Sequence, residues 1–187
     1  AENEISAKRD KVIHAISGNL CRCTGYRPII DAGMSAVEAK QKTLVVPKLP
    51  ASEPLLGYAR PLSLAELDRC LEAHPDARLV AGGTDLMLEV TQDYRDLPQF
   101  IDVSAVPELT SWVIEREQIR IGAAVPYAAL ERGLCESLGE AGQQLLKLLG
   151  RLGSPQIRHV GTVGGNLANG SPIADIPPVL MVMDGVI

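Results

Sequence analysis

The sequence has few aromatic residues and no long apolar run. Phe, Trp and Tyr make up 3% of its 187 residues, so Leu, Ile, Val and Ala must pack the interior. No apolar run approaches the roughly 20 residues that a membrane span requires. The chain also has no basic run or aromatic platform for nucleic acid, and its formal net charge is −5. We therefore expect neither a membrane nor a nucleic-acid partner.

The cysteines are too few and too scattered for a secreted disulfide framework. Cys21 and Cys23 are too close to pair easily, and Cys70 and Cys135 stand alone. The chain opens on the polar segment AENEISAKRD rather than on a signal peptide. These observations predict a cytoplasmic protein.

With 46% hydrophobic residues, the chain can bury a proper core. Its periodic segments alternate irregularly between helix and strand, which predicts an α+β fold rather than a regular doubly wound sheet. Helices are expected over residues 5–16 and 29–42, after the Ser63–Glu66 capping box, after Thr84, and over 126–133 and 136–152. Strands are expected over residues 78–80, 100–104, 112–117 and 118–125, with the last two forming a hairpin.

A first glycine pair follows the predicted strand in AGGTDL, residues 81–86. Glycines at the end of a strand allow a sharp turn and can bring backbone N–H groups close to an anion. Thr84 offers a hydroxyl donor and could also cap the next helix. The alternative is a tight strand-to-helix turn with no ligand. The G-x-G-x-x-G spacing of a dinucleotide fingerprint is absent.

A second glycine pair lies in TVGGN, residues 162–166, within GTVGGNLANGSPIADIPP. Two such segments fit a diphosphate group held from two sides by backbone N–H groups. We therefore interpret the glycines as positions of close approach to a ligand, and we expect the two pairs to meet in space. Asp175 would accept hydrogen bonds from hydroxyl or amino groups of the same ligand. Its alternative role is that of a turn-forming residue before Ile-Pro-Pro.

The segment NLCRCTGYRP, residues 19–28, holds two thiols two residues apart. Thiolates bind soft iron or zinc, but two thiols make only half of a four-thiolate site. Spacing alone also allows a pair of ordinary surface thiols.

These segments resemble the xanthine dehydrogenase (molybdenum hydroxylase) family. GNLCRCTGYRPI resembles the second cysteine loop of its helical [2Fe-2S] domain. LVAGGTDL and GTVGGNLANGSPIADIPP resemble the two flavin-binding segments of its FAD domain, in the same order. The resemblance implies an FAD-binding domain of the PCMH (vanillyl-alcohol oxidase-like) type after part of an all-helical [2Fe-2S] domain. The expected boundaries are 1–44 for the [2Fe-2S] part, 45–57 for a linker, and 58–187 for an FAD domain that is incomplete at its C-terminus.

The resemblance also implies an electron relay. Electrons from a molybdenum-pterin (molybdopterin) centre on a partner subunit would pass through [2Fe-2S] clusters to FAD and then to NAD. Cys21 and Cys23 would supply two of the four thiolates of one cluster. Leu152 falls where some relatives carry an aromatic residue against the cofactor. The implied FAD-binding residues are Leu79, Val80, Ala81, Gly82, Gly83, Thr84, Asp85, Leu86, Leu152, Thr162, Val163, Gly164, Gly165, Asn166 and Asp175.

The chain departs from the family pattern in what it lacks. The ferredoxin-like domain and the CxxC that completes the cluster are absent, so we expect a fragment that is inactive alone. Two other functions stay open. The chain could belong to a related flavin subunit, of a carbon monoxide or aldehyde dehydrogenase, or it could be a non-catalytic module that holds zinc with a partner.

Overall fold

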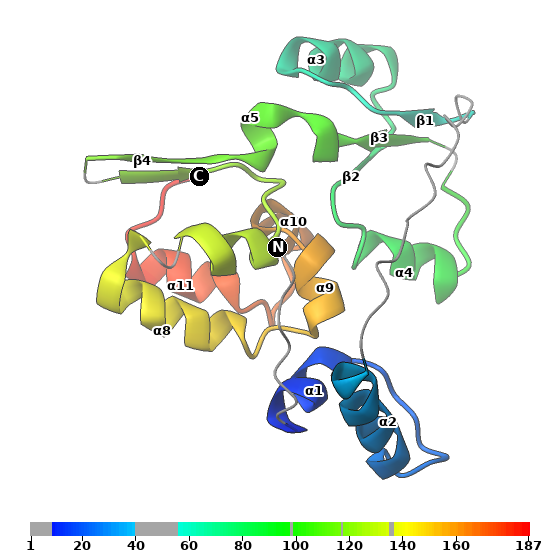
Figure 1. The fold of residues 1–187 in the computed structure, drawn as a ribbon. Helices are drawn as coiled ribbons and strands as arrows, with labels where there is room; N and C mark the ends of the chain where they lie inside the picture. The colour runs from blue at the N-terminus through cyan, green and yellow to red at the C-terminus, as the bar shows by residue number, and fades with distance from the viewer. Residues whose placement is uncertain (1–8, 40–55, 98, 117, 135–136) are drawn as a thin grey trace. The chain divides into compact units, whose positions relative to one another are not determined.

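The computed structural model describes residues 9–39, 56–97, 99–116, 118–134 and 137–187 (Figure 1). The chain divides into two compact units, Ala1–Ala51 and Ser52–Ile187, and each is described by itself.

Residues 9–39 of the first unit form two helices, α1 (Arg9–Ile16) and α2 (Arg27–Glu38). They pack closely, since a Cβ atom added to Gly33 would lie 2.6 Å from Cγ1 of Val12. Pro28 occupies the first turn of α2, where its fixed φ suits the helix. The predicted helix over residues 29–42 is too long, however: Ala39 is already extended. Residues 5–8 and 40–42 of the two predicted helices lie outside the described residues.

The second unit opens with a small parallel sheet of strand order β1-β3-β2. The buried side chain of Ile101 lies on the central strand. The Ser63 cap of the predicted capping box before α3 is confirmed, since Ser63 Oγ accepts a hydrogen bond from the N–H of Glu66. The Glu66 carboxylate reaches back one residue further than a capping box requires and accepts from the N–H of Leu62. The elements are β1 (Tyr58–Ala59), α3 (Leu64–Ala73), β2 (Arg78–Val80), α4 (Leu86–Thr91) and β3 (Phe100–Asp102). Strand β1 was not predicted.

The rest of the unit is an antiparallel hairpin packed on helices (Figure 1). The hairpin is confirmed, with Trp112 opposite Ile121 and Glu115 opposite Gln118. Its apolar side chains pack on a core centred on Val125, Leu149 and Ile176. The elements are η1 (Val103–Ala105), α5 (Pro107–Thr110), β4 (Trp112–Glu115), β5 (Gln118–Ile121), α6 (Tyr127–Ala129), η2 (Leu130–Leu134), α8 (Gly139–Leu149), α9 (Pro155–Val160), α10 (Val163–Asn169) and α11 (Ile176–Val182).

The second glycine segment differs most from the prediction. Residues 163–169 form helix α10 rather than a loop, and the helix ends at Gly170 in the left-handed conformation, with φ of 60°. Helices α9 and α11 on either side were not predicted either.

Candidate functional site

A groove of about 670 Å³ brings the two glycine segments together. The ~80 residues between them fold so that Gly82 lies directly against the end of α9, which precedes the second segment. The predicted meeting of the two segments is therefore confirmed. Of the predicted binding residues, the groove is lined by Leu79 to Leu86, Leu152, Thr162, Gly165, Asn166 and Asp175.

The first glycine pair turns the chain sharply from β2 toward α4. Gly83 has a φ of 67°, which glycine adopts without steric cost. A Cβ atom on Gly82 would lie 1.9 Å from the carbonyl oxygen of Val160. Gly82 is therefore required by the close packing of its backbone on α9, whereas Gly83 is favoured by its positive φ.

The N–H groups of this turn are unpaired within the described residues. Gly82, Gly83, Thr84 and Asp85 donate no hydrogen bond to any of those residues, although all four line the groove. Asp85 rather than Thr84 occupies the N-cap position of α4, and its side chain makes no capping bond. The predicted capping role of Thr84 is wrong. The unpaired donors can receive an anionic ligand.

In the second glycine segment, by contrast, backbone N–H groups already have hydrogen-bond acceptors within the protein. The N–H of Val163 donates to the Val125 carbonyl, and that of Gly164 donates to the Ala123 carbonyl at 2.8 Å. Gly165 donates to Oγ1 of Thr162, the N-cap of α10. These acceptors satisfy the N–H groups of the first turn of α10, which have no partner within the helix. The predicted cradle of N–H groups is therefore wrong for this segment.

Helical periodicity decides which residues of this segment reach the groove. Thr162, Gly165, Asn166 and Asn169 share one face of α10 and line it. Val163 instead packs in the core. A Cβ atom on Gly164 would lie 2.5 Å from the Cβ of Ala123. The structure thus places Val163 and Gly164 away from the groove, contrary to their prediction as binding residues.

Asp175 lies in the groove at the N-cap position of α11. Its side chain makes no capping hydrogen bond, so the carboxylate stays available to a ligand. The start of α11 is held by Asn166, whose Oδ1 accepts a hydrogen bond from the N–H of Ile176 at 3.4 Å. The amide side chain of Asn166 therefore has a structural task besides facing the groove.

Tyr127 is a groove residue that the sequence did not indicate. Its side chain is 3% exposed, and its buried hydroxyl has no hydrogen-bond partner among the described residues. Burial, with a smaller contribution from the charge of Asp175, raises the pKa of Tyr127 to about 12. The residue keeps its proton and remains a hydrogen-bond donor. No local pattern around VPYAAL distinguishes it from an ordinary core tyrosine.

Other groove residues were missed for simpler reasons. Ser171, Ile173 and Ala174 lie inside the long glycine-rich motif, where their position before Asp175 could have indicated them. Arg78 and Glu89 also line the groove and form an ion pair with each other at its edge.

The cysteine loop lies in the other unit. Cys21 Sγ is 3.3 Å from Oγ1 of Thr24, and Tyr26 Oη accepts a hydrogen bond from the Cys21 N–H. Hydrogen bonds from the Thr24 side chain and from the backbone lower the pKa of the Cys21 thiol, which favours the thiolate that metals bind. Within the described ranges, no three His, Cys, Asp or Glu side chains gather into a metal site.

Comparison with protein families matches both parts of the chain. The family described as "FAD binding domain in molybdopterin dehydrogenase" covers residues 52–187, and the one described as "[2Fe-2S] binding domain" covers residues 1–34. The chain belongs to the molybdenum hydroxylase family. It carries the FAD-binding domain of these oxidoreductases together with a [2Fe-2S]-binding region, and the predicted fold class and cofactors FAD and [2Fe-2S] are confirmed.

The relatives of this molybdenum hydroxylase chain are much longer. It is 31% identical to a xanthine dehydrogenase of Drosophila pseudoobscura pseudoobscura, with 89% of this chain and 17% of that protein covered. It is 26% identical to the xanthine dehydrogenase/oxidase of Rattus norvegicus, with 92% and 17% covered. The chain thus spans about a sixth of these relatives.

Solved structures of the family share the fold. The chain resembles a Cu,Mo-CO dehydrogenase with 28% identity and a TM-score of 0.60, covering 72% of this chain and 46% of that one. It also resembles quinoline 2-oxidoreductase from Pseudomonas putida 86, with 26% identity, a TM-score of 0.60, and 70% and 45% covered. Among the described helices, none combines the length and apolar character needed to cross a membrane.

Three features of the groove fit FAD. Considering described residues alone, the N–H donors at residues 82–85 and the buried hydroxyl of Tyr127 have no hydrogen-bond partner, and the Asp175 carboxylate makes no capping bond.

Proposed function

We propose that the chain is part of the FAD/[2Fe-2S] electron-transfer subunit of a cytoplasmic xanthine dehydrogenase. In this proposal a partner subunit with a molybdenum-pterin centre oxidises the substrate, and NAD is the final acceptor. The similarity to xanthine dehydrogenases from an insect and a mammal supports this choice within the family. The observation that carries the flavin role is the set of unpaired N–H groups at residues 82–85 in the groove.

In this proposal different predicted residues bind different parts of FAD. The N–H groups of residues 82–85 donate to the diphosphate oxygens, while Leu79 and Val80 bring the chain to the groove at the end of β2. Thr162, Gly165 and Asn166 form the facing wall, and Asp175 accepts from hydroxyl or amino groups. Leu152 forms an apolar surface at the groove. FAD, when bound, supplies the hydride chemistry.

Cys21 and Cys23 supply two of the four thiolates of one [2Fe-2S] cluster, and the other two come from residues outside this sequence. The proposed boundaries are residues 1–44 for this domain, 45–57 for the linker and 58–187 for the FAD domain. In the complete subunit, Cys23→Ser should lower both iron and acid-labile sulfide.

A second candidate is the flavin subunit of a relative with another substrate. The structural similarity to a CO dehydrogenase and a quinoline oxidoreductase favours it. Substrate choice depends on the molybdenum centre, which lies outside this chain. A zinc-binding interaction module has less support, because zinc binding by the cysteines does not explain the groove between the glycine segments.

The test uses the complete enzyme purified with its partner subunit. A flavin absorption spectrum with stoichiometric FAD, together with iron and acid-labile sulfide, is expected. Anaerobic addition of xanthine should bleach the flavin, and NAD should restore its absorbance. Bleaching by CO or an aldehyde, but not by xanthine, would favour the second candidate. Zinc without flavin would contradict both.

A further inference from the structure

The corner between α8 and α9 places Leu152, which also packs in the core, at the wall of the groove. Gly153 follows with a φ of 58°, and a Cβ atom there would lie 2.9 Å from Cγ2 of Ile157. Ser154 then caps α9, with its Oγ accepting from the N–H of Ile157 at 3.4 Å. The corner is therefore a tight left-handed turn, and within the described residues no backbone N–H donates to the carbonyl oxygens of Leu152 or Gly153.

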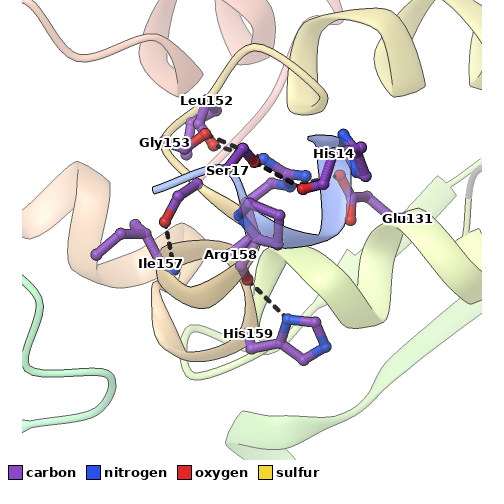
Figure 2. Close-up of polar contacts among 10 residues, drawn as sticks. His14, Ser17, Glu131, Leu152, Gly153, Ile157, Arg158 and His159 are labelled. Carbon is purple, nitrogen blue, oxygen red and sulfur yellow. Dashed lines mark hydrogen bonds and ion pairs between the residues drawn. The ribbon is translucent and has the colours of Figure 1, made fainter. Parts of the chain in front are cut away.

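Arg158 holds this corner from the next turn of α9. Its Nη1 donates to the carbonyl oxygens of Leu152 at 3.3 Å and of Gly153 at 3.1 Å. Figure 2 shows the side chain between the corner and Glu131. The Arg158 Nε lies 2.8 Å from the Glu131 Oε1, in an ion pair without the alignment of a hydrogen bond.

The contacts join three elements that are separate in the sequence. Glu131 lies in η2, a stretch of π-helix, and fixes the guanidinium from the side opposite the corner. π-Helical turns occur frequently at functional sites. Arg158 itself is not among the residues that line the groove, whereas Leu152 is. A planar guanidinium suits this task because one nitrogen can reach both carbonyl groups while another faces the carboxylate.

We propose that Arg158 is a positioning residue for the flavin site. By holding the carbonyl groups of Leu152 and Gly153, it fixes the apolar wall that the Leu152 side chain presents to the cofactor. Arg158 does not touch FAD and acts through Leu152. The inference rests on the proposed flavin function, and it adds a residue that the family resemblance did not indicate.

A double-mutant cycle tests this dependence in the complete enzyme after its flavin has been removed. FAD dissociation constants are measured by fluorescence titration for the wild type, Arg158→Met, Leu152→Ala and the double variant. Because two charge-assisted bonds are lost, Arg158→Met should weaken FAD binding about tenfold. In the Leu152→Ala background the same change should have roughly no effect, since the residue through which Arg158 acts is gone.

Two further variants separate positioning from general stability. Arg158→Lys keeps a positive charge beside Glu131 and should fold, but it cannot donate to both carbonyl groups in the same way, so FAD binding should weaken by less than in Arg158→Met. The neighbouring Arg151 is exposed and makes no ion pair with described residues, so Arg151→Met is a matched control that should leave binding unchanged. Circular dichroism of bound flavin should change in Arg158→Lys and not in Arg151→Met.

The outcomes distinguish the inference from the function on which it rests. If the wild type binds FAD and the effects of Arg158→Met and Leu152→Ala multiply independently, the positioning role is wrong and the flavin site stands. Equal effects of Arg158→Lys and Arg151→Met would also overturn it. If the wild type binds no FAD, the proposed function fails and the inference fails with it.

Discussion

The two glycine pairs have the same Gly-Gly sequence, but their backbone N–H groups differ in hydrogen bonding. At residues 82–85 the N–H groups have no acceptor within the described chain, whereas at residues 163–165 they donate to Val125, Ala123 and Thr162. The first segment offers donors to a ligand. The second is a helix face that supplies shape and side chains. A repeated Gly-Gly pattern is therefore no proof of a repeated role.

The glycines themselves also differ within each pair. Gly82 and Gly164 allow close contact with the backbone of Val160 and Ala123 respectively, so they serve the fold. Gly165 lies on the groove face of α10, and Gly83 turns the chain with a positive φ. Substitutions can separate these roles.

The largest effect is expected for Gly82→Ala in the complete subunit. The new Cβ atom would overlap the Val160 carbonyl, which is a backbone group and cannot move aside by changing a rotamer. We expect a loss of about 3 kcal/mol or more in the free energy of unfolding. Thermal and denaturant unfolding would measure it. Gly83→Asn is the control, because Asn tolerates a positive φ and should cost far less. Equal stability of the two variants would contradict the close packing of the two segments.

Gly165→Val should abolish FAD retention with a smaller effect on stability. Its side chain would project into the groove, while its Cβ atom would lie 2.8 Å from Oγ1 of Thr162 and disturb that cap. Loss of a cap costs about 1 kcal/mol. Flavin absorbance per subunit and a melting curve check both parts. Normal flavin content in this variant would remove Gly165 from the site.

Tyr127→Phe should have the smallest effect at neutral pH and a clear one at high pH. An unfolded tyrosine has a pKa near 10, whereas burial raises the pKa of folded Tyr127 to about 12. Its contribution to stability is therefore complete below about pH 10 and is lost as the pH rises toward 12. The variant should lack this loss. Unfolding curves of both proteins between about pH 9 and 12 test it, and parallel curves would contradict the buried position of Tyr127.

Local patterns in the sequence predicted the elements with short-range causes. The Ser63 cap of α3 and the hairpin of β4 and β5 needed only neighbouring residues, and both are confirmed. Helix α10 was missed because two glycines weigh against a helix. Its start is instead stabilised by tertiary hydrogen bonds to Ala123 and Val125, which no local pattern reveals.

Site residues that lie within the sequence motifs could be predicted, whereas residues brought to the site by tertiary packing could not. The glycine segments and Asp175 indicated the groove residues well. Val163 and Gly164 were assigned to the site because a loop would expose every residue, while a helix turns these two toward the core. Tyr127 and Arg158 reach their positions only through the folded arrangement of α6 and α9.

Amide hydrogen exchange tests the central claim, that FAD binds through the N–H groups of the first segment. Exchange is compared by mass spectrometry between the flavin-free and FAD-loaded complete enzyme, in peptides that cover residues 79–91 and 162–170. Strong slowing is expected at residues 82–85, whose donors have no acceptor among the described residues, and little change at 163–165, where acceptors are already present. Slowing confined to residues 163–165, or none in either segment, would contradict it.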